Sequence, residues 1–312
     1  LNMMKSSSNF NRCLALLGAA AMVLGASEFA ARILIPRFSG IEGRVAVERS
    51  EARSLHSTPQ HRQLLIVGNS LLEASVQVPA INAALTDGWQ AKRFVIENTA
   101  FLDWFFGIKG LLEAGSRPDV LALMLSPKQL ITNNLRGTYS SYHLFSAEDS
   151  FRAGRLASYH PTEISGLLIG HFSAAYGLRT EIRSVAMQRA IPHAETIAQI
   201  FKGGRGTEFD WRDPKVRHIA EQRFDSLRAL CEQYQIRCIF LPPAEPTLTD
   251  HARAASQIAT AHGLAADQFL FSEGYATGAF QSDQFHMTQQ GAKAYSAKLG
   301  PALAAWLAQP SL

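Results

Sequence analysis

Residues 64–70 read Leu-Leu-Ile-Val-Gly-Asn-Ser, and they predict the centre of the fold. A short run of aliphatic residues that ends at Gly68 is typical of a buried strand in a parallel sheet. Gly68 permits a tight turn, and a helix-prone stretch begins at Ser70. Ligands of open parallel sheets bind outside the carboxyl ends of the strands. Ser70 is therefore a candidate nucleophile, and the cap of a short helix is the alternative interpretation.

The rest of the chain alternates strands with helices. Further strands are expected at 93–96, 120–125 and 237–241, with a weaker fifth at 268–271. Helices are expected at 103–114, 214–233 and 289–308. This alternation predicts an α/β three-layer sandwich, flavodoxin-like, with a mostly parallel five-stranded sheet and right-handed crossovers.

A long stretch at 136–212 interrupts the alternation, with helices expected at 162–177 and 181–201. An insertion of this length beside the end of a strand is typical of a lid or a substrate-recognition region. A helical ornament without a ligand is the alternative.

The composition of the 312-residue chain excludes several classes of protein. Thirty Lys and Arg against 26 Asp and Glu give a net charge of only +4, and no basic run is interleaved with aromatic residues. Nucleic-acid binding is therefore not expected. The 47% of hydrophobic residues is ordinary for a globular protein. Polar and apolar residues nearly cancel in the mean hydropathy, which excludes a multi-span membrane protein. No cysteine or histidine has metal-ligand spacing, so we assign no metal and no cofactor.

Two cysteines, Cys231 and Cys238, lie seven residues apart. They are predicted either to pair as a disulfide, if the domain is exported, or to be buried thiols.

The N-terminal segment, residues 1–36, has the pattern of an export signal. Lys5 and Arg12 precede the apolar run 13–27, and no acidic residue occurs before Glu28. About 15 residues span only about 22 Å as a helix, less than the roughly 30 Å of a bilayer core. However, residues 29–35 continue the apolar pattern, and there is no clean cleavage site. We favour an uncleaved signal anchor over a cleaved signal, and a buried helix of a cytosolic protein is the remaining alternative.

The basic flank of this segment places the N-terminus inside the cell. The bulk of the chain is then periplasmic or otherwise extracytoplasmic, held at the inner membrane by a single helix. Residues 37–62 are polar and irregular and predict a tether to a domain at 63–312.

Asp283 and His286 form the only Asp-x-x-His pair in the chain, just before the last expected helix. A histidine can act as a general base when an aspartate orients its ring, and a three-residue spacing lets one loop carry both. Thr288 is a plausible cap for the helix that follows.

Together, Ser70 and the Asp283–His286 pair resemble the SGNH (GDSL-like) esterase and acyltransferase superfamily over about residues 63–308. The resemblance implies that Ser70 is the nucleophile, His286 the general base and Asp283 its orienting acid. The usual Gly-Asp-Ser reads Gly68-Asn69-Ser70 here.

Two further blocks depart from the pattern of that family. The second block, usually Asn-x-Gly, reads Asn98-Thr99-Ala100, so the resemblance assigns the oxyanion to the N–H groups of Ser70 and Ala100. The third block lacks its asparagine, and Gln129 or Lys128 is a candidate for its place. The candidate substrate-binding residues are Asn69, Asn98, Tyr139, Tyr142 and His143; the last three are equally explained as solvated loop residues.

The strand that ends in Ser126-Pro127 and the N-terminal anchor resemble one branch of the superfamily, which includes D-alanyl transfer proteins and exopolysaccharide O-acetyltransferases. The stretch 241–246 (Leu-Pro-Pro-Ala-Glu-Pro) looks similar too. The resemblance implies acyl transfer on an envelope or exopolysaccharide glycan, with a multi-span membrane acyltransferase as a possible partner.

Two rival functions remain open: a carbohydrate O-acyl esterase, and a degenerate, non-catalytic glycan-binding or scaffold protein. The aromatic run 104–106 (Trp-Phe-Phe) either lines a sugar pocket or, as we favour, belongs to the core face of a helix.

Overall fold

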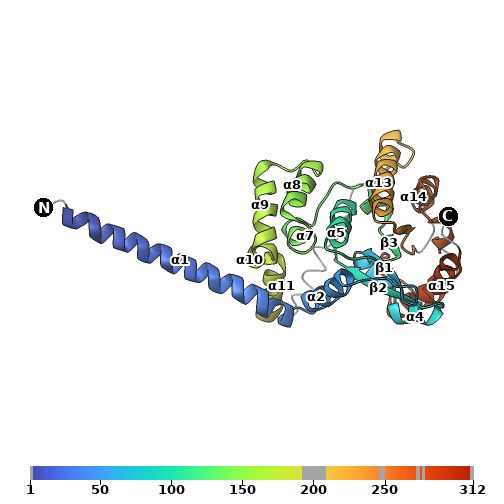
Figure 1. Cartoon of the computed structure of the whole chain (residues 1–312), viewed down its shortest axis with the longest axis horizontal. Coiled ribbons are helices and arrows are strands. Elements are labelled where there is room, and N and C mark those ends of the chain that lie inside the picture. The colour runs from blue at the N-terminus through green and yellow to red at the C-terminus, as the bar shows by residue number, and fades with distance from the viewer. Residues whose placement is uncertain (1–2, 192–208, 246–249, 272–274, 276–277, 310–312) are drawn as a thin grey trace.

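The structure is a computed structural model, and it describes residues 3–191, 209–245, 250–271, 275 and 278–309. It is an α/β fold built on a four-stranded, all-parallel sheet with the order β2-β1-β3-β4 (Figure 1). The strands are β1 (Arg62–Gly68), β2 (Trp89–Val95), β3 (Val120–Met124) and β4 (Arg237–Leu241). The inner strands β1 and β3 are buried almost throughout, which confirms the apolar runs predicted as parallel strands.

The described residues form four strands rather than the predicted five, because residues 268–271 are not a strand. Ala265 makes one parallel bridge with Ile239 of β4, where the Phe240 N–H donates to the Ala265 carbonyl (3.1 Å). The chain then enters the short 3₁₀ helix η1 (Asp267–Phe269), whose Phe269 is fully buried in the core. Phe269 is therefore a core residue on a helical turn, and the partly buried Phe271 packs against the same cluster.

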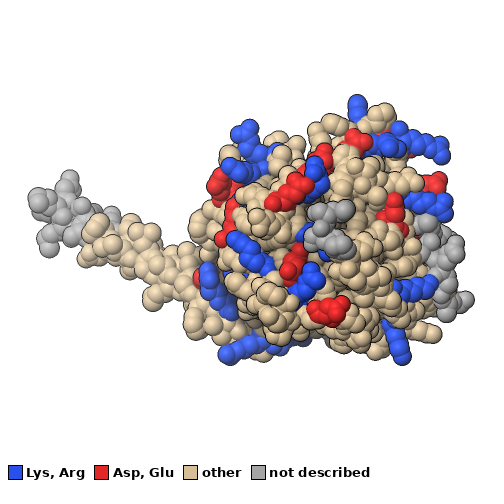
Figure 2. Space-filling model, turned by 45° about the vertical axis from the view of Figure 1, so that its right-hand side comes forward, with Lys and Arg blue, Asp and Glu red and all other residues tan. Residues whose placement is uncertain are grey.

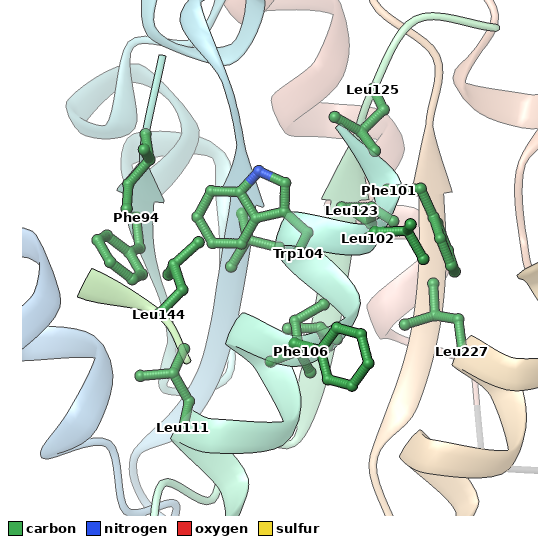
Figure 3. Packing of buried hydrophobic residues seen from close by; sticks show 14 of the residues in the cluster. Phe94, Phe101, Leu102, Trp104, Phe106, Leu111, Leu123, Leu125, Leu144 and Leu227 are labelled. Carbon is green, nitrogen blue, oxygen red and sulfur yellow. The ribbon is translucent and has the colours of Figure 1, made fainter. Parts of the chain in front are cut away.

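Helices pack against both faces of the sheet and bury two apolar clusters. One face carries α5 (Phe101–Glu113), α6 (Pro127–Ile131), α13 (Pro214–Gln233) and α14 (Asp250–Ala261). The other carries α3 (Ser70–Ser75), α4 (Val78–Ala84) and α15 (Gln289–Leu307). Figure 3 shows the first cluster, where Trp104 of α5 lies edge-on to Phe94 of β2 with 5.4 Å between ring centroids. Trp104 is fully buried and Phe106 is 3% exposed, which confirms the core interpretation of this aromatic run.

The predicted tether is wrong for its central part, because residues 40–53 form a packed helix. This helix, α2 (Gly40–Arg53), follows the cap residue Ser39 and lies along the edge strand β2. Glu48 accepts hydrogen bonds from the Val95 N–H (2.8 Å) and from Arg93 (3.0 Å). The polar residues that suggested a tether therefore satisfy the open edge of the sheet, a place where unpaired backbone groups need cover.

The N-terminal helix α1 (Met3–Phe38) extends as a single rod away from the globular part (Figure 1). Residues 10–38 are long and apolar enough to cross a membrane, as an anchor or a signal sequence is. On the face drawn in Figure 2, basic and acidic side chains are interspersed over the globular part, whereas the projecting rod is largely without charge. Near its end α1 joins the fold, because Ala31 and Ile35 are buried in the core.

The insertion after β3 is helical, as predicted, over its described residues. Its helices are α7 (Thr138–His143), α8 (Ala147–Leu156), α9 (Pro161–Phe172), α10 (Ala174–Gly177) and α11 (Arg179–Ala190). The end of the helix predicted at 181–201 lies outside the described residues. The insertion packs against α1 and α5 and bonds to Glu42 of α2, at the end of the globular part from which α1 leaves (Figure 1).

Candidate functional site

Ser70 stands at the carboxyl end of the central strand β1, where the sequence places it. A Cβ at Gly68 would lie 2.6 Å from the Met124 carbonyl oxygen of β3, so only glycine fits this close crossing. Asn69 then caps α3: its Oδ1 accepts from the Leu71 N–H (3.1 Å), and its Nδ2 donates to the Thr99 carbonyl (2.9 Å). The turn is thereby tied to the loop after β2, and Ser70 begins the helix.

Asp283 and His286 lie on the loop before α15, which is closed at both ends by backbone contacts. The Thr288 N–H donates to the Ala279 carbonyl (2.9 Å), and Thr288 Oγ1 accepts from the Gly291 N–H (3.2 Å) as the cap of α15. Within the loop, the Gln281 N–H donates to the His286 carbonyl (2.7 Å). These bonds hold the loop in one shape and turn its histidine toward β1.

The structure brings Ser70, His286 and Asp283 into one hydrogen-bonded chain. His286 Nδ1 lies 2.6 Å from Asp283 Oδ2, and His286 Nε2 lies 2.9 Å from Ser70 Oγ. An ionised carboxylate only accepts, so Nδ1 carries the proton toward Asp283. In the neutral ring Nε2 then accepts, and Ser70 donates its hydroxyl proton to it.

Asp283 is held in the ionised form that this arrangement needs. Burial raises its pKa, but the hydrogen bond with His286 and the N–H groups of Phe285 and His286 outweigh burial and lower the pKa overall. Those two N–H groups lie 2.9 and 3.0 Å from Asp283 Oδ1. A carboxylate so placed can orient a histidine and stabilise its positive charge.

The site is open to solvent. The side chains of His286 and Asp283 are 32% and 45% exposed, and the neighbouring Phe285 is 69% exposed. A bulky molecule can therefore approach His286 and Asp283 without a large opening of the fold. A separate groove of about 460 Å³ lies between α8 and α9, lined by residues such as Phe151 and Ile164, and it includes none of the three site residues.

The predicted oxyanion donors are supported unequally. No acceptor for the Ser70 N–H is found among the described residues, as expected at the first residue of a helix. The Ala100 N–H, however, donates to Asp103 Oδ2 (2.8 Å), so its assignment as an oxyanion donor is wrong for this structure. Gln129 acts as a cap instead, because its Oε1 accepts from the Ser126 N–H (3.0 Å) at the start of α6.

The two asparagines predicted to bind substrate differ in exposure. Asn69 is fully buried with both amide atoms bonded, so it supports the turn and cannot meet a substrate. Asn98 is exposed just beyond the end of β2, with a φ of +56° that asparagine tolerates better than most residues.

The structure does not bring the three predicted residues of α7 to Ser70. Tyr139 donates a hydrogen bond to Glu42 of α2, and His143 Nε2 lies 3.2 Å from the other carboxylate oxygen of Glu42. Tyr142 is half-buried with its ring against His143. The prediction for these residues is wrong because closeness to β3 in sequence does not place α7 at the end of β1.

Sequence reasoning missed a group of partly buried, paired charges beside the end of β2. Arg44 pairs with Glu97, and Arg136 pairs with Glu181 (2.9 Å) and lies 3.7 Å from Glu97. The signal was present in α2, where the buried positions 42, 45, 48 and 52 recur at helical spacing. The spacing was not recognised because two of the four buried residues, Glu42 and Glu48, are charged.

No protein-family model matches the chain, and no curated protein matches its sequence significantly. The fold and the geometry around Ser70 therefore carry the functional case. Within the described residues, no group of three or more His, Cys, Asp or Glu side chains could hold a metal ion. The arrangement around Ser70 is a serine hydroxyl activated through a histidine, which suits acyl-group chemistry.

Proposed function

We propose that this protein is a membrane-anchored serine enzyme of the SGNH type, which transfers acyl groups to or from an envelope or exopolysaccharide glycan. The observation that carries the proposal is the hydrogen-bonded chain from Asp283 through His286 to Ser70. Its two segments are 216 residues apart in sequence. The order β2-β1-β3-β4 also matches the first four positions of flavodoxin-like sheets, which supports the proposed fold type.

In the proposed reaction, His286 Nε2 takes the Ser70 proton while Ser70 Oγ attacks the carbonyl carbon of an acyl ester. The carbonyl oxygen becomes an oxyanion, and the Ser70 N–H is placed to donate to it. The bond to the leaving alcohol then breaks, and that alcohol takes the proton from His286. In the second half, a glycan hydroxyl gives its proton to His286 and attacks the acyl-serine, and the Ser70 hydroxyl is regenerated.

The anchor is part of the same proposal. The end of α1 packs into the globular part through Ala31 and Ile35, which favours a helix that is kept over a signal that is removed. The catalytic domain then stands on the outer side of the inner membrane. A glycan substrate, and a multi-span acyltransferase as the donor's source, follow from this location and from the resemblance.

One observation favours a second candidate, the non-catalytic glycan-binding or scaffold protein. The Ala100 N–H is bonded to Asp103, so one predicted oxyanion donor is occupied. Loss of such a donor costs about 10²- to 10³-fold in rate in serine enzymes. A carbohydrate esterase differs from the transferase only in accepting water in the second half-reaction.

The test measures turnover of an activated acetyl ester by the full chain in detergent, with and without oligosaccharide acceptors. We expect Ser70→Ala to lower turnover by at least about 10³-fold, because the nucleophile is lost. Ser226→Ala, an exposed serine of α13, is the matched control and should leave turnover unchanged. Acyl transfer to the oligosaccharide selects the transferase, and release of free acid alone selects the esterase.

Equal turnover in the wild type and in Ser70→Ala would exclude the proposed mechanism. Absence of both turnover and a trapped acyl-serine would favour the non-catalytic candidate.

A further inference from the structure

Glu28 fixes the insertion to α1 at one level of the helix. Its carboxylate accepts hydrogen bonds from Ser173 Oγ (2.9 Å), the Ala174 N–H (2.8 Å) and the Ala175 N–H (3.1 Å). Arg32, one turn further along α1, donates to the Phe172 carbonyl (3.2 Å). The junction between α9 and α10 is therefore held beside Glu28 and cannot move along α1 independently.

The apolar run of α1 that precedes Glu28 is too short to cross a bilayer core by itself, so this junction does not stand clear of the lipid. Between Arg12 and Glu28 lie about 15 residues, or about 22 Å of helix, against a hydrocarbon core of about 30 Å. A flanking arginine can extend its side chain to reach the headgroups. Glu28 cannot do this, because its carboxylate is bonded to the junction. The outer edge of the hydrocarbon core thus lies close to the level of Glu28. Because the α9–α10 junction is bonded to Glu28, the junction lies at the lipid surface.

The surface at this level suits a membrane interface. Phe172 and Ile169 of α9 are 67% and 51% exposed, and Phe29 of α1 is 69% exposed. Arg32, which donates to the Phe172 carbonyl, supplies an exposed cation beside them. Aromatic and aliphatic side chains next to arginines are typical of helices that lie in the headgroup region. The same face of α9 is polar farther from α1, at Thr162 and Ser165.

The arrangement of the helices agrees with this placement. Figure 1 shows α9 and α10 at the end of the globular part from which α1 leaves. The Phe172 carbonyl accepts from Arg32 and Ser173 donates to Glu28, so the exposed apolar end of α9 lies beside α1.

We propose that Phe172 and Ile169, together with Phe29, insert into the outer interface of the bilayer that α1 spans. The insertion then lies on the membrane as a second attachment, and the domain keeps one orientation on the lipid surface. This inference rests on the proposed anchor and is independent of the acyl chemistry at Ser70.

The test places a tryptophan at this contact in the full chain, in vesicles of zwitterionic and anionic phospholipid whose acyl chains carry bromine. Bromine quenches tryptophan only on contact, and the emission of the wild type, with its four tryptophans, is subtracted. We expect the added emission of Phe172→Trp to be quenched as strongly as that of Phe29→Trp. Phe151→Trp is the matched control, because Phe151 is an exposed phenylalanine of α8 in the same insertion, and it should not be quenched.

The outcomes distinguish the proposal that α1 is a membrane anchor from the proposal that α9 also contacts the bilayer. Quenching of Phe29→Trp without quenching of Phe172→Trp would overturn the second attachment and leave the anchor standing. In that case aqueous iodide should quench Phe172→Trp, which shows that the face is free in water or awaits a protein partner. If bromine quenches neither residue, the chain does not enter the bilayer, and both proposals fail. Quenching of Phe151→Trp as well would overturn a contact confined to the junction.

Discussion

At the scale of single residues, Asp103 decides what the loop after β2 offers to a substrate. It is fully buried at the start of α5 and accepts from the Ala100 N–H (2.8 Å) and the Arg136 N–H (3.1 Å). Burial raises its pKa to about 6, although these hydrogen bonds partly oppose the rise. One carboxylate thus fixes the loop beside Ser70 and removes a donor from it.

Asp103 should make stability depend on pH in a definite direction. The folded chain protonates this residue near pH 6, whereas the unfolded chain does so near pH 3.8. The folded state therefore binds more protons between these values, so the contribution of Asp103 to the free energy of unfolding rises as pH falls. When the pH is lowered from 7 to 5, the free energy of unfolding of the wild type should rise by about 1 kcal/mol relative to that of Asp103→Asn. Urea unfolding at the two pH values measures this difference. An equal difference between the two proteins at both pH values would contradict this.

The proposed export of the domain predicts a disulfide between Cys231 and Cys238. Their Sγ atoms lie 2.9 Å apart, between the end of α13 and β4. In an oxidising compartment each thiol loses one proton and one electron as the S–S bond forms. The disulfide of an oxidoreductase accepts the two protons and two electrons and becomes a dithiol. We expect mass spectrometry without reduction to find neither cysteine alkylated in the exported protein. Protein retained in the cytosol is the control and should be alkylated at both, and full alkylation of the exported protein would contradict the pairing.

At the scale of elements, a helix could be predicted where its apolar residues recur at helical spacing. A helix whose binding partner is distant in the sequence could not be predicted. The expected helices at 214–233 and 289–308 correspond closely to α13 and α15. Helix α2 was missed because its charged residues bind β2, about 45 positions away, and nothing local shows that partner.

The residues assigned to the candidate site differ in the same respect: some could be predicted from local sequence and others could not. Ser70 and His286 could be placed because each follows a local pattern, a strand that ends in glycine and a loop that ends in a cap. The roles of Tyr139 and His143 could not, since their partner Glu42 is 97 residues from Tyr139. The bond from Ala100 to Asp103 had a local signal, an acidic residue at the third position of the helix.

The close contact between α15 and the loop of His286 leads to a prediction at this scale. A Cβ at Gly291 would lie 2.0 Å from the Ala279 carbonyl oxygen, so Gly291→Ala must push α15 away from the loop. We expect a loss of about 1–3 kcal/mol in the free energy of unfolding and a fall in Ser70-dependent turnover. Gly166→Ala in α9 is the matched control, because its nearest atom is 3.5 Å away. It should be stable and fully active, and equal effects of the two substitutions would contradict the contact.

At the scale of the whole molecule, α1 and the globular part form one body. Glu28 binds the insertion, Ala31 and Ile35 enter the core, and α2 continues the chain along the sheet edge. The predicted irregular tether at 37–62 would have left the domain free to move relative to α1. A continuous helical connection, bonded through Glu28 to the junction of α9 and α10, holds the candidate site in one orientation relative to α1.

This connection predicts where a stable soluble domain must begin. A chain that starts at residue 37 lacks Glu28, Ala31 and Ile35, whereas a chain that starts at residue 28 keeps them. Burial of one isoleucine side chain contributes about 1.5–3 kcal/mol. The free energy of unfolding of the shorter chain, measured in urea, should therefore be lower by at least about 2 kcal/mol. Glu28→Ala in the longer chain separates the carboxylate's share from that of the apolar residues. Equal unfolding midpoints for the two chains would mean that α1 is hinged at residue 37, and the fixed orientation would then be lost.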